Sequence, residues 1–267
     1  MSSTFIIALF VSLILLFASA IKWSLPSKKY LIIIFLSTVF SFAVYFSLKN
    51  LGLNENVLSI IFIFSQLIFY VGIILFLFFR DPERTSPTEP DVIVSPADGT
   101  VIYIKKLPVN SILSSQKKGR MLVFDDLNSS SLANSEILQI GISLLFTDVH
   151  INRSPISGKV SLLVHKPGKF LSLRDENAIN VNERQTIVIE NDKITIGLVQ
   201  IASRLVRRIE SYVKQNDIIH IGQRIGMIKF GSQVDLFIPS EKLEDINVKV
   251  GQYLYAGETI IGNIKNY

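Results

Sequence analysis

The sequence predicts a mainly β domain that is preceded by three membrane-spanning helices. Two observations support this fold class: long apolar segments without charge in the first third of the chain, and short β-branched runs between turn residues after it. The chain has 267 residues, of which 49% are hydrophobic, but the apolar residues are unevenly distributed. Each part therefore has to be analysed separately.

Three segments of the first third have the length and composition of membrane spans. Residues 4–21, 30–48 and 57–79 contain 18, 19 and 23 residues without a charge, and a membrane-spanning helix needs roughly 20. Apolar residues occupy all faces of these segments, which favours lipid over a buried core helix. A cleaved signal peptide would begin with a basic region, which residues 1–5 lack. We therefore expect residues 1–80 to form a membrane anchor.

The basic residues of the anchor predict its orientation. Lys22, Lys28 and Lys29 lie between the first and second segments, whereas the next connection offers Lys49 against Glu55. Because positive loops stay in the cytoplasm, the first connection should be cytoplasmic. The chain after residue 80 is then expected on the cytoplasmic side of the cell membrane, where Arg80 and Arg84 would meet lipid headgroups.

Charge and composition exclude several other functions. The formal net charge is +5, but +4 of it belongs to residues 1–80, so the larger part of the chain is nearly neutral and we expect no nucleic-acid partner. The chain has no cysteine, which excludes disulfides and thiolate chemistry. Its three histidines are dispersed without the spacing of a zinc site, so we expect no metal.

Residues 80–90 are polar and rich in proline, which marks the boundary of a second domain at residues 81–267. Short runs with β-branched or alternating apolar residues then recur between turn signals. They cover residues 92–94, 101–105, 137–146, 159–164, 186–190, 194–199 and 227–230. One segment, 200–214, has apolar residues four apart and predicts a short amphipathic helix. Residues 111–135 show no clear periodicity and are expected to form a mobile excursion.

Glycine-bounded turns near the C-terminus indicate the kind of β domain. Residues 222–226 and 248–262 alternate short strands with glycine turns, as lipoyl-type barrel-sandwich-hybrid domains do. A carrier domain would present a lysine at a hairpin tip, and none lies there. We therefore interpret the pattern as architecture.

Few residues can carry acid-base or nucleophilic chemistry. His150 follows Asp148 at the end of a predicted strand, where catalytic groups are often displayed. Asp98 lies in an Asp-Gly turn, and Ser232 directly follows Gly231, whose missing Cβ permits close approach to its carbonyl. Each feature taken alone is more often structural than catalytic.

Taken together and in order, these motifs resemble the phosphatidylserine decarboxylase family. The resemblance extends from residue 78 to about residue 239. It rests on Phe78-Phe79-Arg80-Asp81-Pro82-Glu83-Arg84, Ser95-Pro96-Ala97-Asp98-Gly99, Asp148-Val149-His150 with Asn152-Arg153-Ser154-Pro155 and Gly158, Asn182-Glu183-Arg184, and Phe230-Gly231-Ser232.

The resemblance implies a precursor that cuts itself between Gly231 and Ser232 and converts Ser232 into a covalent pyruvoyl cofactor. By family analogy Asp98, His150 and Ser232 form the self-processing triad, with His150 as base and Asp98 orienting the imidazole. The products would be residues 1–231 and 232–267, which stay together as large and small chains. The enzyme would then decarboxylate phosphatidylserine to phosphatidylethanolamine.

Four basic residues are candidates for binding the lipid phosphate. Lys166 and Lys169 flank a glycine in a loop, and Arg153 and Arg184 lie in family motifs. A solvated loop is the ordinary explanation for the lysines, and the same alternative applies to the two arginines.

Several alternatives stay open at this point. The Phe-Gly-Ser-Gln context resembles the short, archaeal-type branch, whose members include decarboxylases of other seryl lipids such as archaetidylserine. A membrane-tethered lipoyl-like adaptor without catalysis would explain the glycine turns and the spans, but not the family motifs. An inactive family member and a homo-oligomer are also compatible with the sequence.

Overall fold

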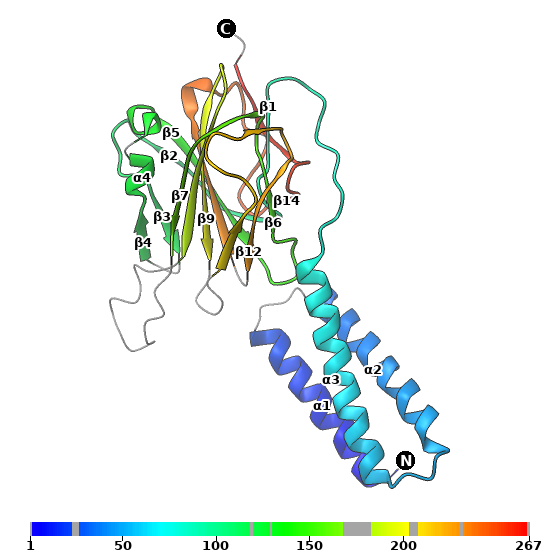
Figure 1. Ribbon diagram of the computed structural model, residues 1–267. Helices are drawn as coiled ribbons and strands as arrows, with labels where there is room; N and C mark the ends of the chain where they lie inside the picture. Colours follow the sequence, from blue (N-terminus) through cyan, green and yellow to red (C-terminus); the bar gives the residue numbers. More distant parts are fainter. Residues whose placement is uncertain are drawn as a thin grey trace. The chain divides into compact units, whose positions relative to one another are not determined.

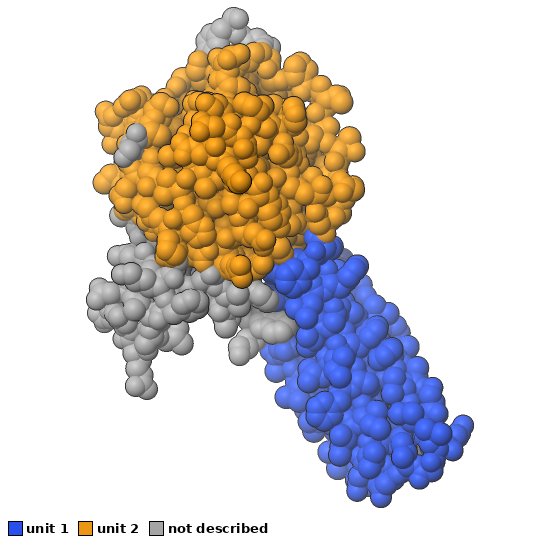
Figure 2. Space-filling view, in the orientation of Figure 1, with its two compact units in different colours: residues 1–80, 145–147 blue, residues 81–144, 148–267 orange. Residues whose placement is uncertain are grey.

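The computed structural model describes residues 2–22, 27–117, 120–128, 130–167, 183–202, 208–229 and 232–265. The chain divides into two compact units, coloured separately in Figure 2. Unit 1 contains residues 1–80 and 145–147, and unit 2 contains residues 81–144 and 148–267.

Unit 1 consists of three long helices, α1 (Ser3–Lys22), α2 (Ser27–Lys49) and α3 (Glu55–Phe79) (Figure 1). All three are long and apolar enough to cross a membrane, as the sequence predicts. Helix α3 packs against both α1 and α2. Many large apolar side chains point away from this packing and are exposed, among them Ile14, Phe35 and Phe76. Such a surface suits hydrocarbon better than water.

The start of α3 is fixed by polar contacts. The side chain of Asn54 caps the helix by accepting a hydrogen bond from the backbone N–H of Asn56 at 2.8 Å. Glu55 in the first turn accepts a hydrogen bond from the Tyr45 hydroxyl of α2 at 3.1 Å. The Tyr45–Glu55 hydrogen bond connects α2 to α3 across the short turn at residues 50–54.

Unit 2 is built around an antiparallel sheet of eight strands in the order β11-β7-β8-β9-β13-β5-β2-β14. Its strands are β2 (Gly99–Leu107), β5 (Ile137–Leu144), β7 (Gly158–Lys166), β8 (Arg184–Glu190), β9 (Thr195–Ala202), β11 (Ile218–Ile219), β13 (Ser232–Pro239) and β14 (Tyr253–Leu254). Three smaller sheets pair β1 (Val92–Val94) with β15 (Ile260–Asn263), β3 (Ser114–Lys117) with β4 (Arg120–Val123), and β10 (Arg208–Ser211) with β12 (Arg224–Lys229) and β6 (Ile151–Arg153). The predicted mainly β fold class is confirmed.

Strand β13 lies between β5 and β9 and contributes to two hydrophobic cores. Val234, Leu236 and Ile238 belong to the larger core, whereas Phe237 belongs to a second core. This division follows from the two-residue period of a strand, which sends neighbouring side chains to opposite faces.

The second core is covered by a segment that the sequence analysis misjudged. Residues 111–135 were expected to form a mobile excursion, but their described part contains β3, β4, α4 (Asp125–Asn128) and η1 (Ser131–Asn134), which the sequence did not predict. Leu113, Phe124, Leu127 and Leu132 from this segment are buried against the sheet. Their irregular spacing follows from several short elements in succession, and a single-period search does not detect it.

The helix predicted for residues 200–214 was also wrong. Strand β9 continues to Ala202, and β10 pairs with β12 from Arg208 to Ser211. The apolar residues Ile201, Ile209 and Val213 are four or eight apart, which fits a strand period of two as well as a helical turn. Residues 203–207 lie outside the described residues.

Candidate active site

The predicted catalytic residues all belong to unit 2, at the starts of strands. Asp98 directly precedes β2, His150 directly precedes β6, and Ser232 is the first residue of β13. The turn before β2 requires Gly99, because a Cβ there would collide with the backbone carbonyl of Ser143 on β5. This close approach fixes the position of the preceding Asp98.

Asp98 is almost completely buried and its carboxylate is held on both oxygens. One oxygen accepts a hydrogen bond from the backbone N–H of Ala256 at 2.8 Å, and the other lies 2.8 Å from a guanidinium nitrogen of Arg84. Burial raises the pKa of Asp98, and the nearby Asp148 acts in the same direction. The Ala256 N–H and the Arg84 charge lower the pKa and offset part of the burial effect.

His150 is fully buried, and its ring is oriented by the backbone. Its Nδ1 lies 2.8 Å from the carbonyl oxygen of Asp148. Because a carbonyl oxygen can only accept a hydrogen bond, Nδ1 carries the proton and Nε2 is the basic nitrogen of the neutral ring. This is the tautomer that a general base needs. The Asp148 carboxylate in turn accepts a hydrogen bond from the Tyr253 hydroxyl at 2.9 Å.

The backbone of Ser232 is fixed between two strands. It pairs with Leu144 at the end of β5 and with Ala202 at the end of β9. Gly231 and the side chain of Ser232 lie outside the described residues. The approach of the Ser232 hydroxyl to His150 and the orienting role of Asp98 therefore stay predictions.

The residues predicted to bind the lipid phosphate make contacts within the protein. Arg153 is buried, and its guanidinium donates to the carbonyl oxygens of Gly222 at 2.9 Å and Pro82 at 3.0 Å. Lys166 forms an ion pair with Asp126 at 2.9 Å.

Arg184 begins β8, where its backbone pairs with Lys166 and Ile201. Lys169 lies outside the described residues. For all four residues, phosphate binding stays a prediction.

Arg84 is a site residue that the sequence analysis missed. Its assignment to lipid headgroups was wrong, because its side chain is only 7% exposed and pairs with Asp98. Arg80, by contrast, is in unit 1 and donates to the carbonyl oxygens of Leu77 and Thr147 at 2.7 and 2.8 Å. The family motif that contains both arginines could have pointed to Arg84. The residue type alone, however, does not distinguish a buried arginine from one at the surface.

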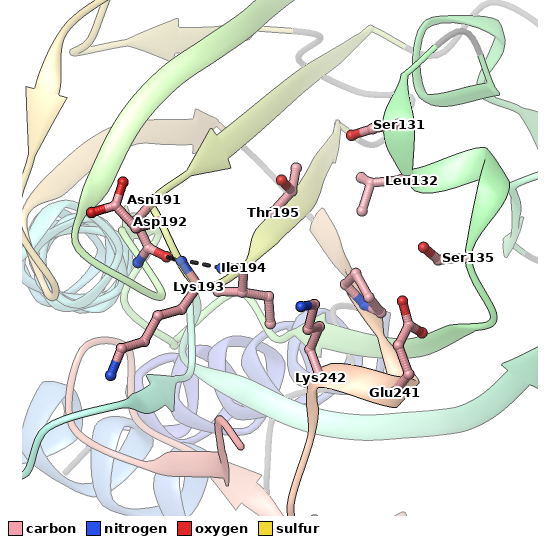
Figure 3. Close-up of a pocket in the computed structure, with 11 residues that line it drawn as sticks. Ser131, Leu132, Ser135, Asn191, Asp192, Lys193, Ile194, Thr195, Glu241 and Lys242 are labelled. Atoms are coloured by element: carbon pink, nitrogen blue, oxygen red, sulfur yellow. Dashed lines mark hydrogen bonds between the residues drawn. The ribbon is translucent and has the colours of Figure 1, made fainter. Parts of the chain in front are cut away.

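The β domain also has a surface pocket of about 280 Å³ (Figure 3). Thr195 at the start of β9 and Pro239 at the end of β13 line it, whereas Ser232 is at the opposite end of β13. Asn191 shapes its rim by accepting hydrogen bonds from the backbone N–H groups of Lys193 and Ile194, both at 3.0 Å. Among the described residues, none of the predicted catalytic residues lines this pocket.

No group of three or more histidine, aspartate or glutamate side chains in the described ranges has the arrangement of a metal site.

Comparisons with known proteins point to one family. The family model "Phosphatidylserine decarboxylase" matches residues 72–262, a range that contains Asp98, His150 and Ser232. A phosphatidylserine decarboxylase proenzyme from Erythrobacter litoralis is 40% identical over 188 residues, which cover 70% of this chain and 72% of the relative. The corresponding proenzyme from Novosphingobium aromaticivorans is 40% identical over 189 residues, covering 70% and 71%. The expected archaeal-type branch is not confirmed by these relatives.

Proposed function

Because the chain belongs to the phosphatidylserine decarboxylase family, we propose that it converts phosphatidylserine to phosphatidylethanolamine and CO2 with a pyruvoyl group made from its own Ser232. The chain is an enzyme of the carboxy-lyase type. The observation that carries the proposal is the family match over residues 72–262, which contains Asp98, His150 and the Gly231-Ser232 bond in their family contexts.

The cofactor would arise by self-cleavage. The Ser232 hydroxyl attacks the Gly231 carbonyl carbon, the peptide C–N bond breaks, and Gly231 is left as an ester on Ser232. Loss of the Cα proton of Ser232 then expels the Gly231 carboxylate, and water replaces the nitrogen, which leaves as ammonia. The new N-terminus at residue 232 is a pyruvoyl group.

His150 is suited to start this reaction. Its buried ring has the proton on Nδ1, so the lone pair of Nε2 can accept the Ser232 hydroxyl proton. During decarboxylation, the same nitrogen would either return a proton to the substrate Cα or orient the substrate carboxylate. The Arg84 and Ala256 contacts hold Asp98 as the second polar group of the site.

The residues present fit a pyruvoyl group at position 232. The backbone there is held on both sides, by Leu144 and by Ala202, so a new N-terminus would stay in place. Such a group supplies a ketone that condenses with the serine amine of the lipid and accepts the electrons released with CO2. The surrounding residues have to bind the lipid headgroup and transfer protons.

The two products of cleavage would stay together as one enzyme. The smaller chain begins with β13, which pairs with β5 over its whole length and with β9 over most of it. Its later strands β14 and β15 pair with β2 and β1 of the larger chain. Separation would expose these strand edges and the core residues of β13 to water.

The three apolar helices support attachment to a membrane, where the lipid substrate is found. We propose that residues 1–80 are the anchor and residues 81–267 the decarboxylase domain, facing the cytoplasm. Support for this orientation comes from Lys22, Lys28 and Lys29 between the first two helices.

Decarboxylation can be tested with vesicles that contain phosphatidylserine. The full-length protein should release CO2 and form phosphatidylethanolamine, whereas the S232A variant should do neither. Vesicles with archaetidylserine form the second arm, and turnover of that lipid alone would change the substrate assignment. Failure with both lipids by a correctly cleaved protein would overturn the proposed activity, and failure by an uncleaved protein would favour the adaptor or an inactive relative.

A further inference from the structure

Residues 81–86, here called the strap, follow α3 in the sequence and are the first residues of unit 2. The strap has no regular secondary structure, yet side chains hold it along its length. Its contacts are Asp81 with Arg153 and Arg224, Glu83 with Arg224, Arg84 with Asp98 and Glu258, and Ser86 with the carbonyl of Ile221. An ordinary linker would not need so many specific contacts.

Two arginines of the neighbouring strands β6 and β12 hold the first half of the strap. Arg224 lies 2.6 Å from Asp81 and 2.7 Å from Glu83. Arg153, which is paired with Arg224 across the two strands, donates to the carbonyl oxygen of Pro82 at 3.0 Å. The strap therefore has a defined register against this sheet, although it forms no strand itself.

The second half of the strap passes close to a glycine. A Cβ at Gly222 would collide with the side chain of Ser86, and the positive φ of Gly222 also favours glycine. The hydroxyl of Ser86 faces the carbonyl oxygen of Ile221 at 3.4 Å. The strap is thus packed on both sides of Arg84.

Arg84 points from the strap into the candidate active site. One guanidinium nitrogen lies 2.8 Å from Asp98, another lies 3.3 Å from Glu258, and the guanidinium is 5.5 Å from the centre of the Tyr255 ring. These three contacts fix the guanidinium in a position where it is only 7% exposed. The attraction between two charges this buried is screened less than at an exposed site, and loss of either partner leaves an uncompensated buried charge.

We propose that the strap is a structural part of the catalytic site, and that Arg84 is a positioning residue that holds the orientation and the negative charge of Asp98. The inference rests on the proposed function, because Asp98 matters for activity only if the chain matures and decarboxylates as described. Arg84 acts through Asp98 and not on the substrate. The strap begins two residues after α3 ends at Phe79, so Arg84 follows the last apolar helix closely in the sequence.

The charges around Asp98 determine in which direction its pKa changes when Arg84 is replaced. Burial raises the pKa of its carboxyl, and the neighbouring Asp148 raises it further, while Arg84 and the N–H of Ala256 lower it. Glu258 faces Arg84 from the other side, and the Tyr253 hydroxyl is bonded to Asp148. Removing the Arg84 charge therefore raises the pKa of Asp98, so that the carboxyl becomes protonated at higher pH. A self-cleavage rate that needs the carboxylate should lose activity at higher pH than in the wild type.

The test follows self-cleavage of the full-length protein in membranes or detergent over time, from mildly acidic to mildly alkaline pH. The R84M variant removes the charge with similar bulk, and R84K keeps the charge but not the fork of donors. The matched control is R208M, which removes an exposed arginine of β10. Arg84 contributes one charge-assisted contact to Asp98, so R84M should slow cleavage by about tenfold or more at neutral pH. The acid limb of its pH–rate profile for self-cleavage should move to higher pH. R84K should have an intermediate rate and profile, and R208M should match the wild type in both.

The outcomes separate the two proposals. A wild-type chain that does not cleave contradicts the proposed function, and with it the positioning role that rests on that function. A cleaving wild type with an R84M variant of unchanged rate and unchanged pH profile overturns the positioning role. If R84M loses its cooperative thermal transition, R84K decides: a slower rate with a displaced pH profile supports the role, and wild-type behaviour overturns it.

Discussion

Replacing His150 with glutamine removes the basic nitrogen from the candidate site while keeping a side chain that can donate a hydrogen bond. The ring is fully buried, and its Nδ1 lies 2.8 Å from the carbonyl oxygen of Asp148. Glutamine keeps an amide N–H, although this N–H lies one bond farther from the backbone than Nδ1, so the fold should lose the packing of the ring and part of this hydrogen bond. No atom of glutamine replaces Nε2 as a base.

The expected magnitude follows from this difference. Removal of a general base typically slows a reaction by about 10²- to 10⁴-fold, which corresponds to about 3 to 5 kcal/mol in the activation free energy. The H150Q variant should therefore unfold at nearly the wild-type temperature but accumulate as uncleaved precursor. Both properties can be measured on the same preparation, by thermal unfolding and by a time course of self-cleavage.

A matched control is available in the same domain. His220 is exposed, and H220Q should cleave at the wild-type rate. Self-cleavage of a folded H150Q variant at the wild-type rate would refute the assignment of His150 as the base. A loss of cleavage in both variants would show that the assay responds to histidine substitution in general.

Three further predictions concern the domain that carries the site. G99A should lower the free energy of unfolding by about 1–3 kcal/mol, because a Cβ there would collide with the backbone of β5; urea denaturation measures it, and wild-type stability would contradict the close approach. L236A should cost about 2–5 kcal/mol in the same assay, because Leu236 is fully buried in the main core, whereas I218A at an exposed position of β11 should change little. Burial raises the pKa of Asp235, which accepts hydrogen bonds from Tyr103 at 2.6 Å and from two glutamines. An acid with a raised pKa contributes to folding stability fully below its unfolded-state pKa, and this contribution is lost as pH rises through its folded-state pKa. The melting temperature of the wild type should therefore fall as pH rises through this range, and D235N should remove that fall. Parallel pH profiles for D235N and wild type would contradict this assignment.

The sequence was sufficient for the parts of the fold that depend on one period or one length. The three apolar segments form α1, α2 and α3, because a helix satisfies its backbone hydrogen bonds internally and is the form expected of a long apolar segment. The run predicted at residues 137–146 contains β5, and residues 227–229 of the run predicted at 227–230 belong to β12. Long spans and regular alternation therefore carry their own structural information.

Other elements could not be predicted because the same pattern serves two structures. The spacing of Ile201, Ile209 and Val213 fits both a helix and a strand, and pairing of β10 with β12 decided in favour of the strand. Leu113 and Phe124 come from short elements whose burial depends on a sheet formed by residues far along the chain. Tertiary contacts decided both cases, and no local window contains them.

The candidate site shows the same division. Asp98 and His150 were singled out by family motifs, and both are buried polar residues at strand starts. Arg84 was assigned to the membrane surface because it follows an apolar helix, whereas the structure buries it against Asp98. Ala256, which donates to Asp98, and Glu258, which pairs with Arg84, lie more than a hundred residues away in the sequence, so these contacts could be known only from the fold.

The most direct test of the central claim is intact mass spectrometry of the full-length protein purified from its membrane, with the S232A variant in parallel. Self-cleavage predicts two chains that correspond to residues 1–231 and 232–267, the second with a pyruvoyl N-terminus, and a single uncut chain for S232A. A single uncut wild-type chain, or a cut at another bond, would contradict the account.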